Sequence, residues 1–174
     1  MSTEIKKEKE PAMNVEATQT GLFARQPLSV LGKIAFWAFL VSVLGGIAGN
    51  IAIASGSGSV SRDLLTSTVI ALIGVIFLAT RFRWAPVVTT LLGGYLLYLV
   101  SIQPYVIESL VHPKTDPNGG FGHFVGVGFA IALGLLAFGG SLGAAVENYR
   151  KSLALNPHNA NALEMLRKLG VSPQ

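Results

Sequence analysis

The sequence contains no cysteine and few charged residues. Without cysteine, the chain forms no disulfide, holds no metal through thiolates and performs no thiol catalysis. This absence does not identify the redox compartment. Charged residues make up 13% of the 174 residues, whereas an ordinary soluble domain carries about a quarter. Hydrophobic residues make up 51%, and the two values together indicate a membrane protein.

Groups that commonly carry chemistry inside a membrane are also missing from the sequence. The apolar blocks hold no carboxylate and no lysine at membrane depth, which ion-coupled transport usually needs. The sequence has no Gly-x-x-x-x-Gly-Lys-Ser/Thr phosphate loop and no nucleophile elbow. The composition therefore favours a non-catalytic protein, although membrane enzymes that use acids in outer loops keep the enzyme class open. No cofactor is indicated.

Four long apolar blocks predict an all-α membrane protein built as a four-transmembrane-helix bundle. The blocks cover residues 31–54, 64–80, 86–106 and 121–146. Their lengths are close to the roughly 20 residues that a crossing helix needs. Ser29 is placed to cap the first helix. No proline interrupts the last block before Asn156-Pro157, so this helix is expected to continue to Leu155 and to project from the membrane.

The segments outside the apolar blocks are predicted to lie in the cytoplasm or at the membrane surface. Residues 1–20 are polar and mixed in charge, which predicts a disordered cytoplasmic tail. Residues 21–30 mix apolar and polar side chains and suit an interfacial segment. Residues 147–174 are amphipathic and broken at Asn156-Pro157, which predicts a cytoplasmic C-terminal helical hairpin.

The basic residues set the predicted orientation. With the amino terminus in the cytoplasm, all but Arg62 and Lys114 of the 13 Lys and Arg residues are cytoplasmic, as the positive-inside rule requires. The expected protein is therefore a multi-pass protein of the cell membrane with both termini cytoplasmic. A cleaved signal peptide ending near Ala52-Ile53-Ala54 is disfavoured, because its apolar block is long and follows a polar tail. The basic residues occur as ones and twos, which disfavours nucleic acid as a partner.

Small residues on the apolar blocks predict faces for close helix packing. Such residues let backbones approach, which drives helix association in lipid. The candidates are Gly45, Gly49, Asn50, Gly93, Gly94, Gly122, Gly126, Ala130 and Gly134, and a second small patch is formed by Gly139, Gly140, Gly143 and Ala144. Asn50 is expected to bond across to a neighbouring helix. The grooves either bury one another within one chain or face another membrane subunit or a second copy.

A metal site is not predicted. Glu108, His112 and His123 lie close enough in sequence to share an outer surface and are weak candidates for metal ligands. Side chains of this kind in loops are usually solvated. No two histidines lie opposite each other at membrane depth, which disfavours a bis-His haem site within the bundle.

The C-terminal segment resembles part of a tetratricopeptide repeat. Ala145, Tyr149, Ser152 and Pro157 have the spacing of the second helix of such a repeat, and residues 159–170 resemble the opening helix of the next. The segment departs from the family at Arg167, which stands at the usual glycine position. The resemblance, over about residues 145–170, implies a protein-docking element that uses Tyr149, Leu153, Leu163 and Leu166. The alternative is an amphipathic tail lying on its own bundle or on the bilayer.

Three functions follow as hypotheses. The first is a non-catalytic accessory, scaffold or assembly subunit of a larger membrane complex. The second is a small pore or transporter protomer that acts as an oligomer. The third is a membrane enzyme or metal-binding protein that uses the outer-loop acids and histidines.

The orientation predicts which cysteine variants can be labelled from outside. A cysteine at Ser57 or Thr115 is expected to react with membrane-impermeant reagents in sealed cells, and one at Phe82 is not, because the basic residues hold that end inside. Labelling of Phe82→Cys under these conditions would overturn the orientation.

Overall fold

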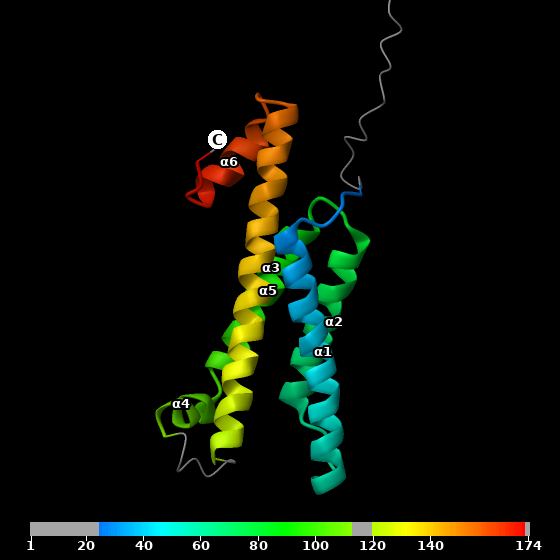
Figure 1. Ribbon diagram of the computed structural model, residues 1–174, viewed down its shortest axis with the longest axis vertical. Helices are drawn as coiled ribbons and strands as arrows, with labels where there is room; N and C mark the ends of the chain where they lie inside the picture. The colour runs from blue at the N-terminus through cyan, green and yellow to red at the C-terminus, as the bar shows by residue number, and fades with distance from the viewer. Residues whose placement is uncertain (1–24, 113–119, 173–174) are drawn as a thin grey trace, which may run out of the picture.

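The computed structural model describes residues 25–112 and 120–172, and these residues form six α-helices without a strand (Figure 1). The all-α class is therefore confirmed for this part of the chain. The helices are α1 (Val30–Ser57), α2 (Arg62–Thr80), α3 (Ala85–Ser101), α4 (Pro104–Val111), α5 (Gly120–Leu155) and α6 (Ala160–Lys168).

Three of these helices are long and apolar enough to cross a membrane. They are α1, α2 and α5. Helix α3 is also apolar but has only 17 residues. Helix α5 has 36 residues without a break, as the absence of proline predicts. At about 1.5 Å per residue this helix is about 54 Å long, well beyond a hydrocarbon core of about 30 Å.

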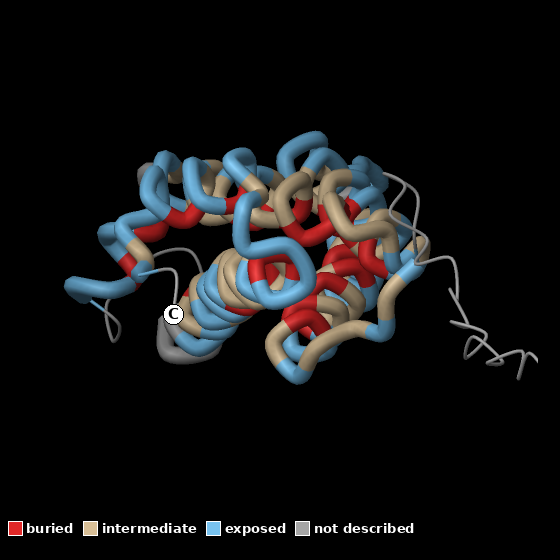
Figure 2. The backbone as a smooth tube through the Cα atoms, turned by 90° about the horizontal axis from the view of Figure 1, so that it is seen from above, coloured by how far each residue is buried: buried red, intermediate tan, exposed pale blue. Residues whose placement is uncertain are grey.

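The four longer helices form a bundle in which each packs on two others. Helix α5 packs on α1 and α3, and α2 packs on the same two helices. The start of α1, the end of α2, the start of α3 and the C-terminal half of α5 lie together with α6 (Figure 1). We call this the α6 end. The α1–α2 turn and α4 lie at the opposite end, which we call the α4 end. Buried residues line the surfaces between helices, and exposed residues cover the outside (Figure 2).

Short polar segments fix where the helices begin and end. The Ser29 hydroxyl accepts a hydrogen bond from Gly32 N at 3.1 Å, which confirms the predicted cap of α1. Gly58 ends α1 with a φ of 69° and donates its N–H to Ala54 O, a left-handed conformation that glycine adopts without steric penalty. Ser61 caps α2 by accepting from Leu64 N.

The predicted third span, residues 86–106, is divided into two helices. Helix α3 ends at Ser101 and α4 begins at Pro104. Proline has no N–H to donate and disfavours a helical conformation at the residue before it. Gln103 accordingly has an extended ψ of 124°. After this break α4 packs against α5 at the α4 end of the bundle (Figure 1).

The core lies between α1, α2, α3 and α5. It contains mainly alanine, valine and leucine around one fully buried aromatic ring, Phe39. Gly74 of α2 faces this ring, and a methyl group there would lie 2.7 Å from the ring carbons. The missing side chain at Gly74 is therefore what makes room for Phe39.

The buried threonine hydroxyls are bonded within their own helices, whereas the buried Ser141 Oγ of α5 has no hydrogen-bond partner among the described residues. Thr89 is fully buried and donates to Ala85 O at 3.0 Å. Thr68 and Ser42 likewise donate to the carbonyl four residues earlier. Because each of these threonine hydroxyls finds its acceptor in its own helix, these helices bring no unsatisfied threonine donor into the apolar interior.

Truncating the buried ring is expected to destabilise the bundle. Phe39→Ala removes a side chain with no exposed surface, and should lower the free energy of unfolding by about 3 kcal/mol. Phe129→Ala is the matched control, because Phe129 of α5 is 56% exposed. Thermal unfolding in detergent measures the difference, and equal losses for the two variants would contradict this core.

Candidate functional site

The closest approach between α3 and α5 is at Gly93. A methyl group on Gly93 would lie 2.8 Å from Phe138 N and 2.9 Å from Phe138 Cα, so the two backbones are in direct contact. A methyl group on Gly94, beside it, would lie 3.5 Å from the Phe138 ring, which is an ordinary contact distance. Further along α5, Gly134 faces Leu97, whose Cδ2 atom would lie 2.7 Å from an added methyl group. The structure thus brings Gly93, Gly94 and Gly134 into one helix–helix contact.

The second small patch of α5 packs on the start of α1. A methyl group on Gly140 would lie 2.9 Å from Leu31 O and 3.0 Å from Ala35 N. Gly143 faces the Leu31 side chain. On the α1 side, a methyl group on Gly32 would lie 3.6 Å from Ala144 Cβ. These positions hold the first turns of α1 against α5.

Glycines of α1 also meet α2. Gly46 is buried against Thr68, and a methyl group on Gly49 would lie 2.8 Å from Leu64 Cδ2. Gly49 therefore belongs to the α1–α2 contact. The sequence predicted Gly49 as a packing residue without indicating which helix it meets.

Other predicted packing residues face open space. A methyl group on Gly45 or Gly126 would meet nothing within 4 Å, and Ala130 is exposed. Gly122 lies in the first turn of α5, where side chains fall outside the described part. On α5, Gly126 is thus unoccupied within one chain, whereas Gly134, Gly140 and Gly143 are packed; Gly139, of the second small patch, also meets nothing within 4 Å.

Asn50 does not bond across to a neighbouring helix. Its Nδ2 atom donates to Gly46 O of its own helix at 3.0 Å. Its Oδ1 atom is buried and has no hydrogen-bond partner within the described residues. The difference arises because the carbonyl one turn earlier is always within reach of a short polar side chain on a helix.

Helix α6 folds back on the end of α5 to form a helical hairpin. Leu153, Ala162 and Leu166 are buried between the two helices, and Tyr149 packs beside them. The hairpin turn is fixed by Asn159, whose Oδ1 accepts from Ala162 N at 3.2 Å and whose Nδ2 donates to Ser152 Oγ at 2.8 Å. Of the predicted docking residues, Leu153 and Leu166 therefore form the hairpin's own core.

The outer surface of this hairpin carries both apolar and charged groups. Leu155, Leu163 and Leu169 are exposed, and Leu155 is 72% exposed. On α6, Lys168 Nζ lies 2.6 Å from Glu164 Oε1. The Lys168 ammonium donates a hydrogen bond to the Glu164 carboxylate. This bond and the positive charge of Lys168 lower the pKa of the Glu164 carboxyl. Leu163 is thus the predicted docking residue that a partner could reach.

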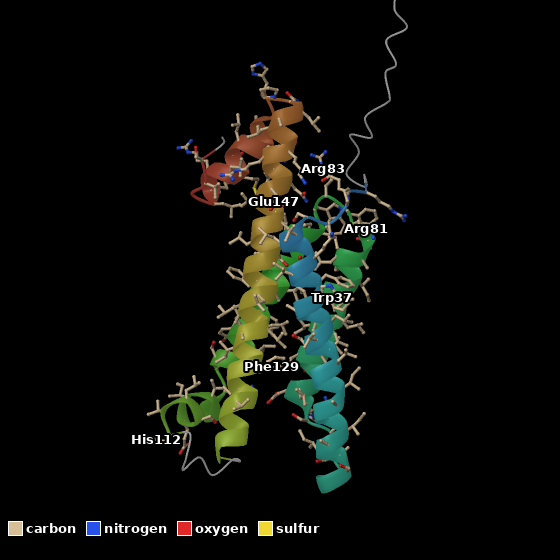
Figure 3. The ribbon with its side chains drawn as sticks, viewed as in Figure 1. Trp37, Arg81, Arg83, His112, Phe129 and Glu147 are labelled. Atoms are coloured by element: carbon tan, nitrogen blue, oxygen red, sulfur yellow. The ribbon has the colours of Figure 1, made fainter. Side chains whose placement is uncertain are left out.

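The weak metal candidates lie at the α4 end. Glu108 and His112 are exposed on and after α4 (Figure 3). The side chain of His123 lies outside the described part of the chain. Within residues 25–112 and 120–172, no three His, Asp or Glu side chains gather closely enough to hold a metal ion.

A polar cluster at the α6 end was not predicted from the sequence. Asn148 Nδ2 of α5 donates to Arg83 O at 3.1 Å, and Gln26 N donates to Arg81 O at 2.9 Å. The α2–α3 turn is therefore tied both to α5 and to the segment before α1. The aromatic and basic run Arg81–Trp84 is the signal that marks this turn in the sequence.

The packing geometry predicts that two glycines will respond differently to the same change. Gly93→Ala is expected to destabilise the protein by about 1–3 kcal/mol, because its methyl group would press on the Phe138 backbone. Gly45→Ala should not destabilise it, because that position is open and alanine favours helix. Thermal unfolding of both variants in one detergent tests this, and a similar loss for both would argue against the contact.

Comparison of the chain with protein-family models, curated proteins and solved structures found no match. The likeness of α5 and α6 to a tetratricopeptide repeat therefore depends on the residues quoted above alone.

Proposed function

We propose that this protein is a non-catalytic accessory or assembly subunit of a larger membrane complex, with four membrane crossings and a docking hairpin in the cytoplasm. The observation that carries the proposal is the α5–α6 hairpin. It continues beyond the part of α5 that packs in the bundle, and it leaves apolar side chains exposed on its outer surface (Figure 1).

The path of the chain supports a fourth crossing. Helices α1, α2 and α5 are the long candidate spans among the described residues. Helix α2 ends at the α6 end of the bundle, whereas α5 begins at the α4 end (Figure 1). The chain between them has to return through the same thickness, and the apolar helix α3 follows this path. With α3 as a crossing, both termini lie on one side.

The distribution of charge supports a cytoplasmic α6 end. Arg62 is the basic residue of the described part that lies at the α4 end. The others gather at the α6 end, and they are Arg25, Lys33, Arg81, Arg83, Arg150, Lys151, Arg167 and Lys168. Under the positive-inside rule this end faces the cytoplasm.

The composition of the hairpin surface supports docking rather than a solvated tail. Leu155, Leu163 and Leu169 are exposed on the outside of a two-helix unit that is already closed by its own core. A tetratricopeptide-like pair of helices normally buries such a face against further repeats. We infer that another subunit supplies this cover.

The unoccupied small residues favour a second candidate function. Gly45 and Gly126 face open space on the outside of the bundle, and such positions suit association of helices in lipid. A homo-oligomer formed there would be consistent with a small pore or transporter protomer.

Replacing Leu163 is expected to remove the partner subunit. The full chain is purified from its native membrane in mild detergent, and co-purifying subunits are quantified by mass spectrometry. Leu163→Asp should lower the yield of a stoichiometric partner at least roughly tenfold, because a charge would enter an apolar contact. Asn161→Asp is the matched control, since Asn161 is exposed on the same helix.

The same preparation separates the two candidate functions. If the Leu163→Asp variant still co-purifies with the partner subunit, the hairpin is not the docking element. A symmetric homo-oligomer without other subunits, weakened by Gly126→Ile, would favour the pore or transporter.

A further inference from the structure

Two arginines far apart in sequence are held side by side at the α6 end. Arg25 pairs with Phe82 as an isolated antiparallel bridge, and Gln26 N donates to Arg81 O at 2.9 Å. These backbone contacts fix the segment before α1 against the turn after α2. The backbone positions of Arg25 and Arg81 relative to each other are therefore set by main-chain contacts.

Arg81 adopts a backbone conformation that arginine rarely adopts. Its φ is 56°, and it is the one residue other than glycine with a positive φ in the described part of the chain. Glycine or asparagine usually occupies this position at the end of a helix. A strained residue at a fixed turn is a reason to look for a function of its side chain.

A surface crevice separates the two elements that carry these arginines. Its volume is about 490 Å³, and it is lined by Arg25, Gln26, Pro27, Ala79, Thr80 and Arg81. A volume of this size is in the usual range for small-ligand sites. Two arginines and no acidic residue are among the residues that line it.

The positive charge of the crevice has no counter-charge in the described part of the chain. Arg25 and Arg81 form no ion pair there. Of the carboxylates in that part, Asp63 and Glu108 lie toward the α4 end, and Glu164 is paired with Lys168. Glu147 lies on α5, outside the crevice lining (Figure 3). An anionic ligand would supply the missing charge.

The crevice lies at the boundary of a candidate membrane span. Helix α2 ends at Thr80, directly before Arg81. Phe82 stacks on Trp84 with ring centroids 5.9 Å apart, and Phe77 meets Trp84 edge-on at 5.3 Å. Aromatic clusters of this kind gather at the level of lipid headgroups. The phosphate groups of the membrane are found at this depth.

We propose that the crevice between Arg25 and Arg81 binds a phosphate group. Planar guanidinium groups form paired, charge-assisted hydrogen bonds with phosphate oxygens. The depth of the crevice favours the headgroup of an anionic phospholipid as the source, and free phosphate is the other source of the same chemistry. The crevice is lined by residues of one chain and needs no partner subunit, so the phosphate proposal and the docking proposal can be overturned separately.

The test measures lipid binding to the full chain in a neutral detergent. Phosphatidylglycerol is titrated, and bound lipid is counted by native mass spectrometry. We expect Arg25→Gln and Arg81→Gly each to bind it about fivefold more weakly. Arg81→Gly keeps the turn, because glycine suits a positive φ. Arg62→Gln removes the same charge at the α4 end, and it should bind like the wild type.

Two further arms distinguish the source of the phosphate. Preference for phosphatidylglycerol over phosphatidylcholine, unaffected by excess inorganic phosphate, supports a lipid headgroup. Displacement of the lipid by inorganic phosphate in the wild type, but not in the two crevice variants, supports free phosphate. The proposal is overturned if Arg25→Gln and Arg81→Gly bind as the wild type does, or if Arg62→Gln weakens binding equally.

Discussion

The bundle depends on direct backbone contact at positions where glycine leaves no side chain between helices. At Gly93 the α3 backbone meets the backbone of Phe138, and at Gly140 the α5 backbone meets that of Leu31 and Ala35. In lipid the hydrophobic effect does not hold helices together, so close packing of this kind has to. The contact at Gly140 also determines the path of the chain before α1. Because the first turns of α1 are held on α5, residues 25–29 lie beside the α2–α3 turn, and the Arg25–Arg81 crevice exists for this reason.

The features that depend on local composition could be predicted from the sequence. The apolar blocks indicated helices because open strand edges are unfavourable in lipid. The long α5 followed from the absence of proline before Pro157, and the start of α1 followed from Ser29. The small residues marked helix faces, but their period could not say which helix each face meets. Gly49 meets α2, and Gly126 meets nothing within one chain, because partner choice depends on crossing angles that no single helix specifies.

The features that depend on competition between local and distant partners could not be predicted. Asn50 could bond across the bundle or back to Gly46, and the nearer carbonyl prevails. Pro104 could bend a span or divide it, and the extended Gln103 divides it. The pairing of Arg25 with Phe82 joins segments that are distant in sequence, and no periodic pattern signals such a contact. For this reason the crevice could not be predicted from the sequence, in which each arginine indicates only the orientation of the chain in the membrane.

The proposed phosphate site and the proposed docking hairpin are both connected to the end of α5. Asn148 of α5 donates to the carbonyl of Arg83, two residues beyond Arg81. One turn later on α5, Ser152 accepts from Asn159 at the hairpin turn. The α2–α3 turn is thus bonded to the end of α5, and α6 is joined to that end by the hairpin turn, where Asn159 bonds to Ser152. A phosphate group bound at Arg81 would hold the turn to which Asn148 is bonded, and that turn supports the end of α5. The hairpin would then be presented to a partner at a fixed height and direction relative to the membrane surface, which is what an assembly subunit needs.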